Sequence, residues 1–286
     1  MSWPTELPSP APAAHCLGSE AYSEYTTLLT RIGTRGWSAL VSYSESWSGS
    51  ELGVWPEPGS LLAVLHGLGL IGFEQLPAGS AGTILVLYLT PAGRRRLLEM
   101  RLPPVHTEYE RLRDRWGTRA KEHHGQVILF AALARRLGYH AEVGVAAPGQ
   151  RLFADVKLIR EDGTEAWCLV ESGSHRDTHP LDRWRRLGRC QPFLPLVAPD
   201  RNTMNQLGEQ ARPHIYKVCL TNLDELILNV DSGNNRLWLI DVNRFRDADL
   251  GRNRVVPGLR SRLVFQFQGH VRARAIHCGG WRETGV

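Results

Sequence analysis

The sequence predicts an α/β protein with a smaller domain in front of it, and three observations predict this class. At 286 residues the chain is long enough for two domains, each with a core of its own. Its 42% of hydrophobic and 22% of charged residues are typical of a folded globular protein and exclude a fibrous or largely disordered one. In the second half, short apolar runs with strand spacing alternate with runs of helical spacing.

We expect five segments along the chain. The first residues are rich in Pro and Ala, as in flexible tails, and Pro103-Pro104 in a basic stretch favours a break between domains. The expected segments are a flexible tail (1–18), a first domain (19–102), a linker helix (103–121), an α/β domain (122–245) and a basic C-terminal extension (246–286).

Composition also predicts where in the cell the protein is located. The longest nearly apolar stretch, 61–73, is shorter than the ~20 residues that a membrane span needs. The first residues lack the basic start and apolar core of a secretion signal. The five cysteines show no CxxC spacing and fit neither a zinc site nor a disulfide pattern. We therefore expect a cytoplasmic protein with no membrane partner.

The net charge changes sign along the chain. Residues 1–90 contain seven acidic side chains and two arginines, a net charge of −5. Because the whole chain carries +5, the remainder carries +10. A nucleic-acid partner would therefore bind beyond residue 90, although a solvated basic surface explains the charge equally well.

The first domain is expected to contain helices around one hairpin. Ser60 and Thr90 are suited to cap helices, and Pro91 falls at a first helical position, where its missing N–H costs nothing. The expected elements are helices at 19–40, at 60–66 and from 90 onward, and strands at 70–75 and 83–88 joined by the turn PAGSAG.

The segment LLAVLHGLGLIGFEQ…LYLTPAGRRRLLE resembles a winged helix, in which a helix is followed by a hairpin wing and another helix. Winged helices that read DNA carry Arg, Lys, Asn or Gln on the helix before the wing. Here that helix offers only Ser60 and His66, and the wing has no charge. We therefore expect this acidic domain to pack or to contact a partner protein rather than to read bases.

The basic stretch 93–121 permits two interpretations. We favour a solvated connecting helix that starts near His106, and the alternative is a stripe that contacts phosphates. The candidate DNA-binding residues here are Arg94, Arg95 and Arg96.

The second domain is expected to alternate strands and helices. The Asp162-Gly163 pair in EDGT signals a hairpin, and Gly138 suits a helix C-cap. The expected helices are 123–138, 178–190 and 203–215, and the expected strands are 140–146, 151–160, 165–172, 193–199, 216–222 and 236–242.

This α-βββ-αβ order, with Asp155 on the second strand and Glu171 on the third, is similar to the core of the PD-(D/E)XK superfamily of restriction-endonuclease-like proteins. The resemblance implies that Asp155 and Glu171 hold Mg²⁺, and that Glu122 adds an acid from the first helix. Two carboxylates from neighbouring strand ends can bind Mg²⁺, which activates water and neutralises phosphate charge.

The sequence departs from that motif where its lysine belongs. The triplet reads Glu171-Ser172-Gly173, so the lysine is absent. Lys157 shares a strand face with Asp155 by the period of two, and His175 or Arg176 is another candidate for a relocated cation. Alternatively, the two acids only cap strands and bind water. We expect a degenerate site, and an enzyme only if these residues supply the missing charge.

A winged helix joined to such a domain also resembles the replication-relaxation family of plasmids and mobile elements. The segment ADVKL…CLVESGSHRDTHPLDRW carries this second resemblance. It implies a role in DNA transactions.

The C-terminal extension is rich in arginine, whose planar fork binds phosphate in two places at once. The candidate DNA-binding residues there are Arg252, Arg254, Arg260, Arg262, Arg272 and Arg274. The function expected from the sequence is therefore a DNA-associated accessory protein of a mobile element or DNA-processing system. The alternatives are a Mg²⁺-dependent DNA endonuclease that uses Asp155 and Glu171, and a protein-interaction module that binds no nucleic acid.

Overall fold

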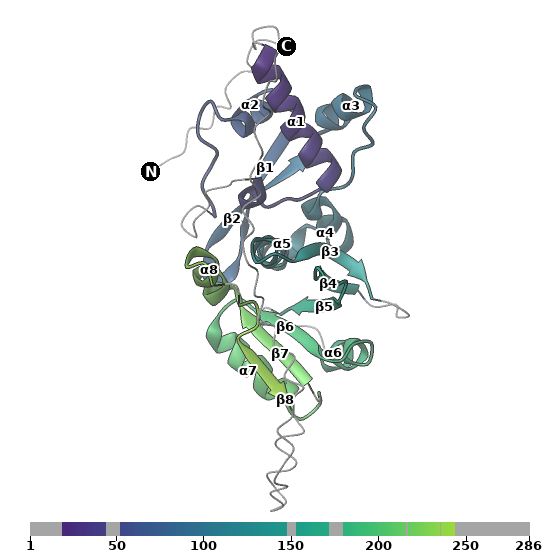
Figure 1. Ribbon diagram of the computed structural model, residues 1–286, viewed down its shortest axis with the longest axis vertical. Coiled ribbons are helices and arrows are strands. Elements are labelled where there is room, and N and C mark those ends of the chain that lie inside the picture. Colours follow the sequence, from purple (N-terminus) through teal and green to yellow (C-terminus); the bar gives the residue numbers. More distant parts are fainter. Residues whose placement is uncertain are drawn as a thin grey trace, which may run out of the picture.

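The protein is an α/β structure with a two-stranded and a six-stranded sheet (Figure 1). The computed structural model describes residues 19–43, 52–147, 153–171, 180–215, 217–234 and 236–243. Among these residues, no helix is both long enough and apolar enough to cross a membrane.

The N-terminal part places three helices around an antiparallel hairpin. Its elements are α1 (Ser19–Arg35), the 3-10 turn η2 (Leu40–Tyr43), α2 (Leu61–Gly67), β1 (Ile71–Pro77), the 3-10 turn η4 (Gly79–Ala81), β2 (Thr83–Leu89) and α3 (Pro91–Glu99). The expected caps form: Ser60 accepts a hydrogen bond from the backbone N–H of Ala63, and Thr90 accepts one from Gly93. The order of helices and hairpin agrees with the sequence prediction.

The hairpin is buried on both faces. On one face, Ile71, Leu87 and Leu89 pack with the helices of the N-terminal part. On the other face, Leu76 and Ile84 belong to a second cluster that includes the buried face of α5 (Lys121–Arg136). A Cβ atom added to Gly125 of α5 would overlap the carbonyl oxygen of Pro77, so helix and strand are in backbone contact. One hydrophobic core therefore crosses the boundary that was expected at 103–121.

The segment expected to be a solvated connecting helix has one buried face. It forms α4 (Glu108–Trp116), which is followed by the 3-10 turn η5 (Thr118–Ala120). Tyr109 and Leu112 lie in the core, and the buried carboxylate of Glu108 forms an ion pair with Arg135 of α5. The charge of this helix had favoured solvent exposure, but its buried acidic residues are paired inside the protein.

The six-stranded sheet follows the chain from one edge to the other. Its strands lie in the order β3 (His140–Ala146), β4 (Phe153–Ile159), β5 (Glu165–Val170), β6 (Leu194–Ala198), β7 (Lys217–Asn222) and β8 (Ile240–Asn243). β4 is antiparallel to both β3 and β5. β5, β6 and β7 are parallel to one another, and β8 is antiparallel to β7.

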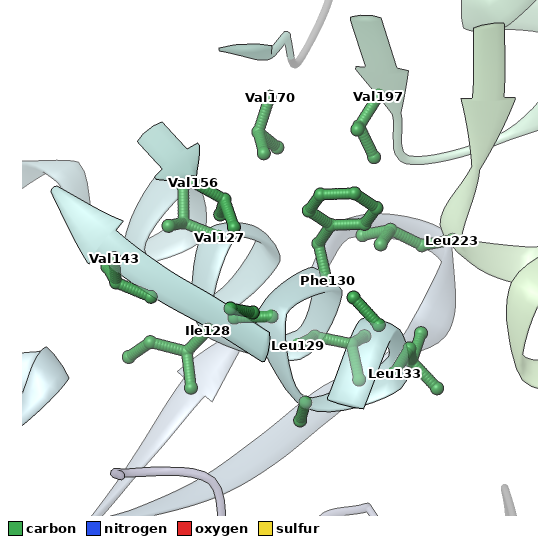
Figure 2. Close-up of a cluster of buried hydrophobic side chains, with 14 of the residues drawn as sticks. Val127, Ile128, Leu129, Phe130, Leu133, Val143, Val156, Val170, Val197 and Leu223 are labelled. Carbon is green, nitrogen blue, oxygen red and sulfur yellow. The ribbon is translucent and has the colours of Figure 1, made fainter. Parts of the chain in front are cut away.

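Helices cover both faces of this sheet. On one face, Phe130 of α5 points toward Val170, Val197 and Leu223 (Figure 2). On the other face, Trp184 of α6 (Pro180–Gly188) packs in a separate cluster with residues of α7 (Arg201–Ala211). The sheet is thus the middle layer between α5 and the α6–α7 pair.

One helix was not predicted. α8 (Leu223–Asp231) begins directly where β7 ends, and Asn222 is both the last strand residue and the N-cap that accepts from Glu225. The signal for this helix was Asn222 with Glu225 three residues later, a pattern typical of a helix start, and the sequence interpretation missed it.

Candidate functional site

Asp155 lies where β4 and β5 separate. The two strands pair from Ile159–Glu165 to Val156–Cys168, and Asp155 is the next residue of β4 beyond the last pair. Its side chain is wholly buried, and its Oδ2 accepts a hydrogen bond of 2.8 Å from the backbone N–H of Val170. The carboxylate therefore satisfies a β5 amide that lies past the end of the ladder.

Glu171 follows β5 directly. Its backbone N–H donates to the carbonyl of Val197 on β6, which continues the parallel pairing by one residue. Its Oε1 accepts a hydrogen bond of 2.8 Å from the indole N–H of the buried Trp184. The sheet and α6 together therefore fix the position of the Glu171 side chain.

Arg183 of α6 brings the two acids together. Its Nη2 lies 2.9 Å from Oδ1 of Asp155, and its Nη1 lies 4.0 Å from Oε1 of Glu171. Nη2 also donates to the carbonyl oxygen of Phe153 at 3.3 Å. One guanidinium group thus pairs with Asp155 and offsets part of the charge of Glu171, the two carboxylates that were predicted to hold a metal.

His123 of α5 approaches Asp155 as well. Its Nε2 lies 3.3 Å from Oδ1 of Asp155, the same oxygen that Arg183 contacts. The ring of Trp116 meets the imidazole edge-on, with ring centres 5.4 Å apart. The site is therefore a cluster of two acids, one arginine and one histidine.

Each charge in this cluster depends on the others. Burial alone would raise the pKa of Asp155, but the positive charges of Arg183 and His123 and the hydrogen bonds to it lower that pKa to about 2. Burial would lower the pKa of His123, yet the Asp155 carboxylate raises it overall. Burial likewise opposes the charge of Arg183, and the two carboxylates raise its pKa. Asp155 and Arg183 are therefore both charged at neutral pH.

As arranged, these residues do not fit a Mg²⁺ site. Both oxygens of Asp155 and one oxygen of Glu171 accept hydrogen bonds, and the arginine cation lies against both side chains. A Mg²⁺ ion needs near-octahedral oxygen ligands, and the carboxylate oxygens that could supply them are engaged by protein donors here. Within the described residues, no group of three or more His, Cys, Asp or Glu side chains is arranged to hold a metal.

Two other predicted site residues lie elsewhere. Lys157 forms an ion pair of 2.6 Å with Glu165, and its ammonium lies over the Trp167 ring. Glu122 is exposed; it accepts a hydrogen bond from Gln126, next to the η4 turn. It is thus His123, not its neighbour Glu122, that α5 directs to Asp155. His175 and Arg176 lie outside the described residues.

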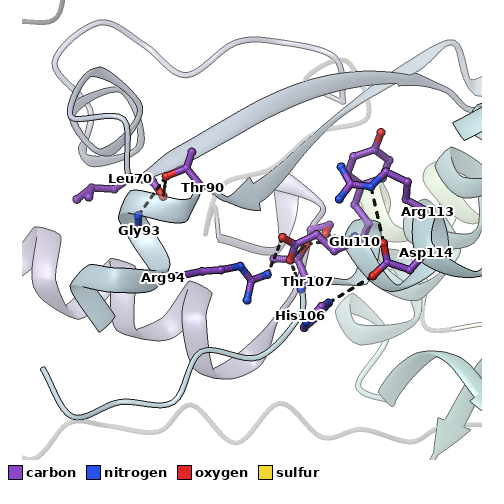
Figure 3. Close-up of polar contacts among 11 residues, drawn as sticks. Leu70, Thr90, Gly93, Arg94, His106, Thr107, Glu110, Arg113 and Asp114 are labelled. Carbon is purple, nitrogen blue, oxygen red and sulfur yellow. Dashed lines mark hydrogen bonds and ion pairs between the residues drawn. The ribbon is translucent and has the colours of Figure 1, made fainter. Parts of the chain in front are cut away.

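The predicted DNA-binding arginines of α3 have different surroundings. Arg94 forms an ion pair of 2.6 Å with Glu110, which also accepts from Thr107 in a capping box (Figure 3). Arg96 pairs with Glu99, and Arg95 is exposed. Of these three, only Arg95 is well placed to contact a phosphate. The arginines predicted at 252, 254, 260, 262, 272 and 274 lie outside the described residues.

The sequence interpretation missed His123, Arg183 and the hydrogen bond made by Trp184. Helical spacing had placed Trp184 inward, and this was the available signal, because a residue beside a buried tryptophan lies near the same sheet surface. That Arg183 would reach two strands could not be derived without the position of α6.

Comparison with protein-family models, with curated proteins and with solved structures finds no match to this chain.

Proposed function

We propose that this protein is a DNA-associated accessory protein whose nuclease-like site is closed by an arginine. One observation carries the proposal: the guanidinium of Arg183 lies 2.9 Å from Asp155 and 4.0 Å from Glu171, the two acids that an active site of this kind would use to bind Mg²⁺. With Arg183 there, the charge of the acidic pair is partly offset by the protein itself. The site then keeps the architecture of a nuclease without its metal chemistry.

The order of the elements supports the nuclease-like part of the proposal. A buried helix, α5, precedes three antiparallel strands, and a helix then leads to a parallel strand, as in the restriction-endonuclease-like core. The helices and hairpin before it are ordered as in a winged helix. The combination is the one that resembles the replication-relaxation family of mobile elements.

The distribution of charge supports association with DNA. The chain carries +10 beyond residue 90, and a polyanion gains affinity from such charge by releasing counterions. The wing, by contrast, is turned inward: Ser80 of η4 donates to the carboxylate of Asp224 and to the carbonyl of Pro199. DNA would therefore be bound by basic groups outside the wing: residues 91–121 and 246–286 each carry a net charge of +5, whereas residues 122–245 carry no net charge.

A cleavage assay and a binding assay test this proposal together. Supercoiled and linear DNA are incubated with the protein and Mg²⁺ or Mn²⁺, and DNA binding is followed by fluorescence anisotropy over a salt series. We expect no cleavage, and binding that weakens steeply with salt. Absence of binding at low salt would refute the proposal and favour the protein-interaction module.

The second candidate is a Mg²⁺-dependent endonuclease, and the partial exposure of Arg183, 29%, favours it as the alternative. Cleavage by the wild type that is lost in both Asp155→Asn and Glu171→Gln would establish this function. Arg186→Gln is the matched control, because Arg186 is exposed on the same helix as Arg183.

A further inference from the structure

A basic pocket lies at the C-terminal end of α6, apart from the acidic site. It has a volume of about 310 Å³ and is lined by side chains from α6, from the turns after α6 and α7, and from the start of β7. Its basic side chains are Arg185, Arg189, His214 and Lys217, and no acidic residue is among the described residues that line it.

We propose that this pocket binds the phosphate group of a nucleotide. The inference rests on the proposed association with DNA, and it names the place where one phosphate of the strand is held. Volumes of this order are those of small-ligand pockets.

Two cations of the pocket are available to a ligand. Arg189 and Lys217 are exposed, and neither has an ion-pair partner among the residues that the structure describes. They come from different elements, the turn after α6 and the first residue of β7, so they approach the pocket from separate directions. A phosphate between them would gain two charge-assisted contacts.

Arg185 and His214 complete the set of donors. Nη2 of Arg185 lies 3.1 Å from Nδ1 of His214, and since a guanidinium only donates, Nδ1 must accept. The remaining ring nitrogen of His214 is then the N–H that can donate to a ligand. Asp182 lies 3.6 Å from Arg185, but both side chains are about half exposed or more, so this ion pair is weak.

An aromatic ring lies beside these cations. Phe193 lines the same pocket; it is partly buried and packs against the hydrophobic core on one side. Aromatic faces stack with any base, and a site with cations and one ring is typical of binding to single strands without sequence preference. The pocket therefore suits a nucleotide better than an isolated inorganic anion.

The pocket and the acidic site lie at opposite ends of the parallel strands. Glu171 follows the C-terminal end of β5, whereas Lys217 is at the N-terminal end of β7, and β5, β6 and β7 run in the same direction. The acids therefore do not repel a phosphate in the pocket at short range. Bound nucleic acid would contact a face of the molecule that does not include Asp155.

The test uses the full chain and the double variant Arg189→Gln/Lys217→Gln. Both side chains are exposed, so we expect the variant to fold with an unchanged unfolding temperature. The control is Arg201→Gln/Arg212→Gln. Arg201 is in α7 and Arg212 follows it; both are exposed, and neither lines the pocket. The probes are a short fluorescein-labelled single-stranded DNA and, separately, deoxyadenosine monophosphate.

For the DNA strand, we expect the pocket variant to bind about tenfold more weakly than the control, and the slope of log K against log salt to fall by about 0.7, as expected for one lost phosphate contact on a single strand. If the pocket variant and the control bind DNA with equal affinity, the proposed phosphate site is refuted, whereas the proposed association with DNA is not.

Binding of the free nucleotide tests the pocket even if the protein does not bind DNA. If the wild type binds no DNA, the proposed function fails; the pocket is then upheld by calorimetric binding of deoxyadenosine monophosphate that the pocket variant loses. If the wild type binds neither probe, the pocket is refuted as well.

Discussion

The guanidinium of Arg183 forms an ion pair of 2.9 Å with Asp155, whose carboxylate is wholly buried. A second carboxylate, that of Glu171, lies 4.0 Å from the other terminal nitrogen of the same guanidinium. The arginine therefore lies between two acids that would otherwise repel each other inside the protein. The free energy of unfolding should depend on this arginine.

Replacing Arg183 should destabilise the fold. In Arg183→Gln the buried Asp155 loses its main counter-charge, and we expect a loss of about 2–3 kcal/mol in the free energy of unfolding, less than for a fully buried pair because Arg183 is 29% exposed. Urea denaturation measures this change. Arg186→Gln, on the same helix, should stay within about 0.5 kcal/mol of the wild type. A loss no larger than that of the control would contradict the role given to Arg183.

Stability should fall in acid because of Asp155. Its pKa is lowered from 3.8 to about 2 in the folded protein, so its contribution is present above pH 4 and disappears as the pH falls toward 2. The shift corresponds to about 2 kcal/mol. Unfolding by urea between pH 2 and 7 should show this loss in the wild type, and the acid limb should be flatter in Asp155→Asn. If the free energy of unfolding falls equally with acid in the wild type and in Asp155→Asn, the role given to Asp155 is contradicted.

Stability should also fall as the pH rises, because of His123. The Asp155 carboxylate raises the pKa of His123, so the stabilisation is complete below the pKa of the unfolded chain and is lost as the pH rises through the folded value. In His123→Gln this loss should disappear. Titration of the imidazole by NMR gives the direct readout, and a folded pKa below about 6.5 would exclude this prediction.

The contact between α5 and the hairpin should be intolerant of a single methyl group. In Gly125→Ala the new Cβ would overlap the carbonyl oxygen of Pro77, and overpacking of this kind costs about 1–3 kcal/mol. Gly67→Ala is the matched control, because a Cβ there meets nothing within 4 Å. Thermal unfolding of both variants checks the prediction, which is wrong if the two variants have the same unfolding temperature.

Much of the secondary structure could be predicted because its signals are local. Ser60 and Thr90 cap the helices that they were expected to cap, and the expected strand 140–146 forms with the same bounds. The burial of the hairpin on both faces had a signal that was not used: the run ILVLYL is apolar at both odd and even positions, as in strands covered on two sides.

The site could be predicted only in part. The resemblance to nuclease-like cores implied that Asp155 and Glu171 would lie near each other, and the guanidinium of Arg183 lies 2.9 Å from one and 4.0 Å from the other. The sequence could not show that this cation would come from α6, because the approach of a helix to a strand depends on packing between distant segments. Lys157 was expected beside Asp155 by strand alternation, but its long side chain reaches Glu165 instead.

Binding of Mn²⁺ tests most directly the central claim, that the acidic site with Arg183 in place holds no metal. Free Mn²⁺ is measured by electron paramagnetic resonance during titration of the wild type, Arg186→Gln and Asp155→Asn. We predict that all three bind Mn²⁺ equally weakly, since the site at Asp155 is already neutralised by Arg183. Tight binding by the wild type and by Arg186→Gln that disappears in Asp155→Asn would contradict the account.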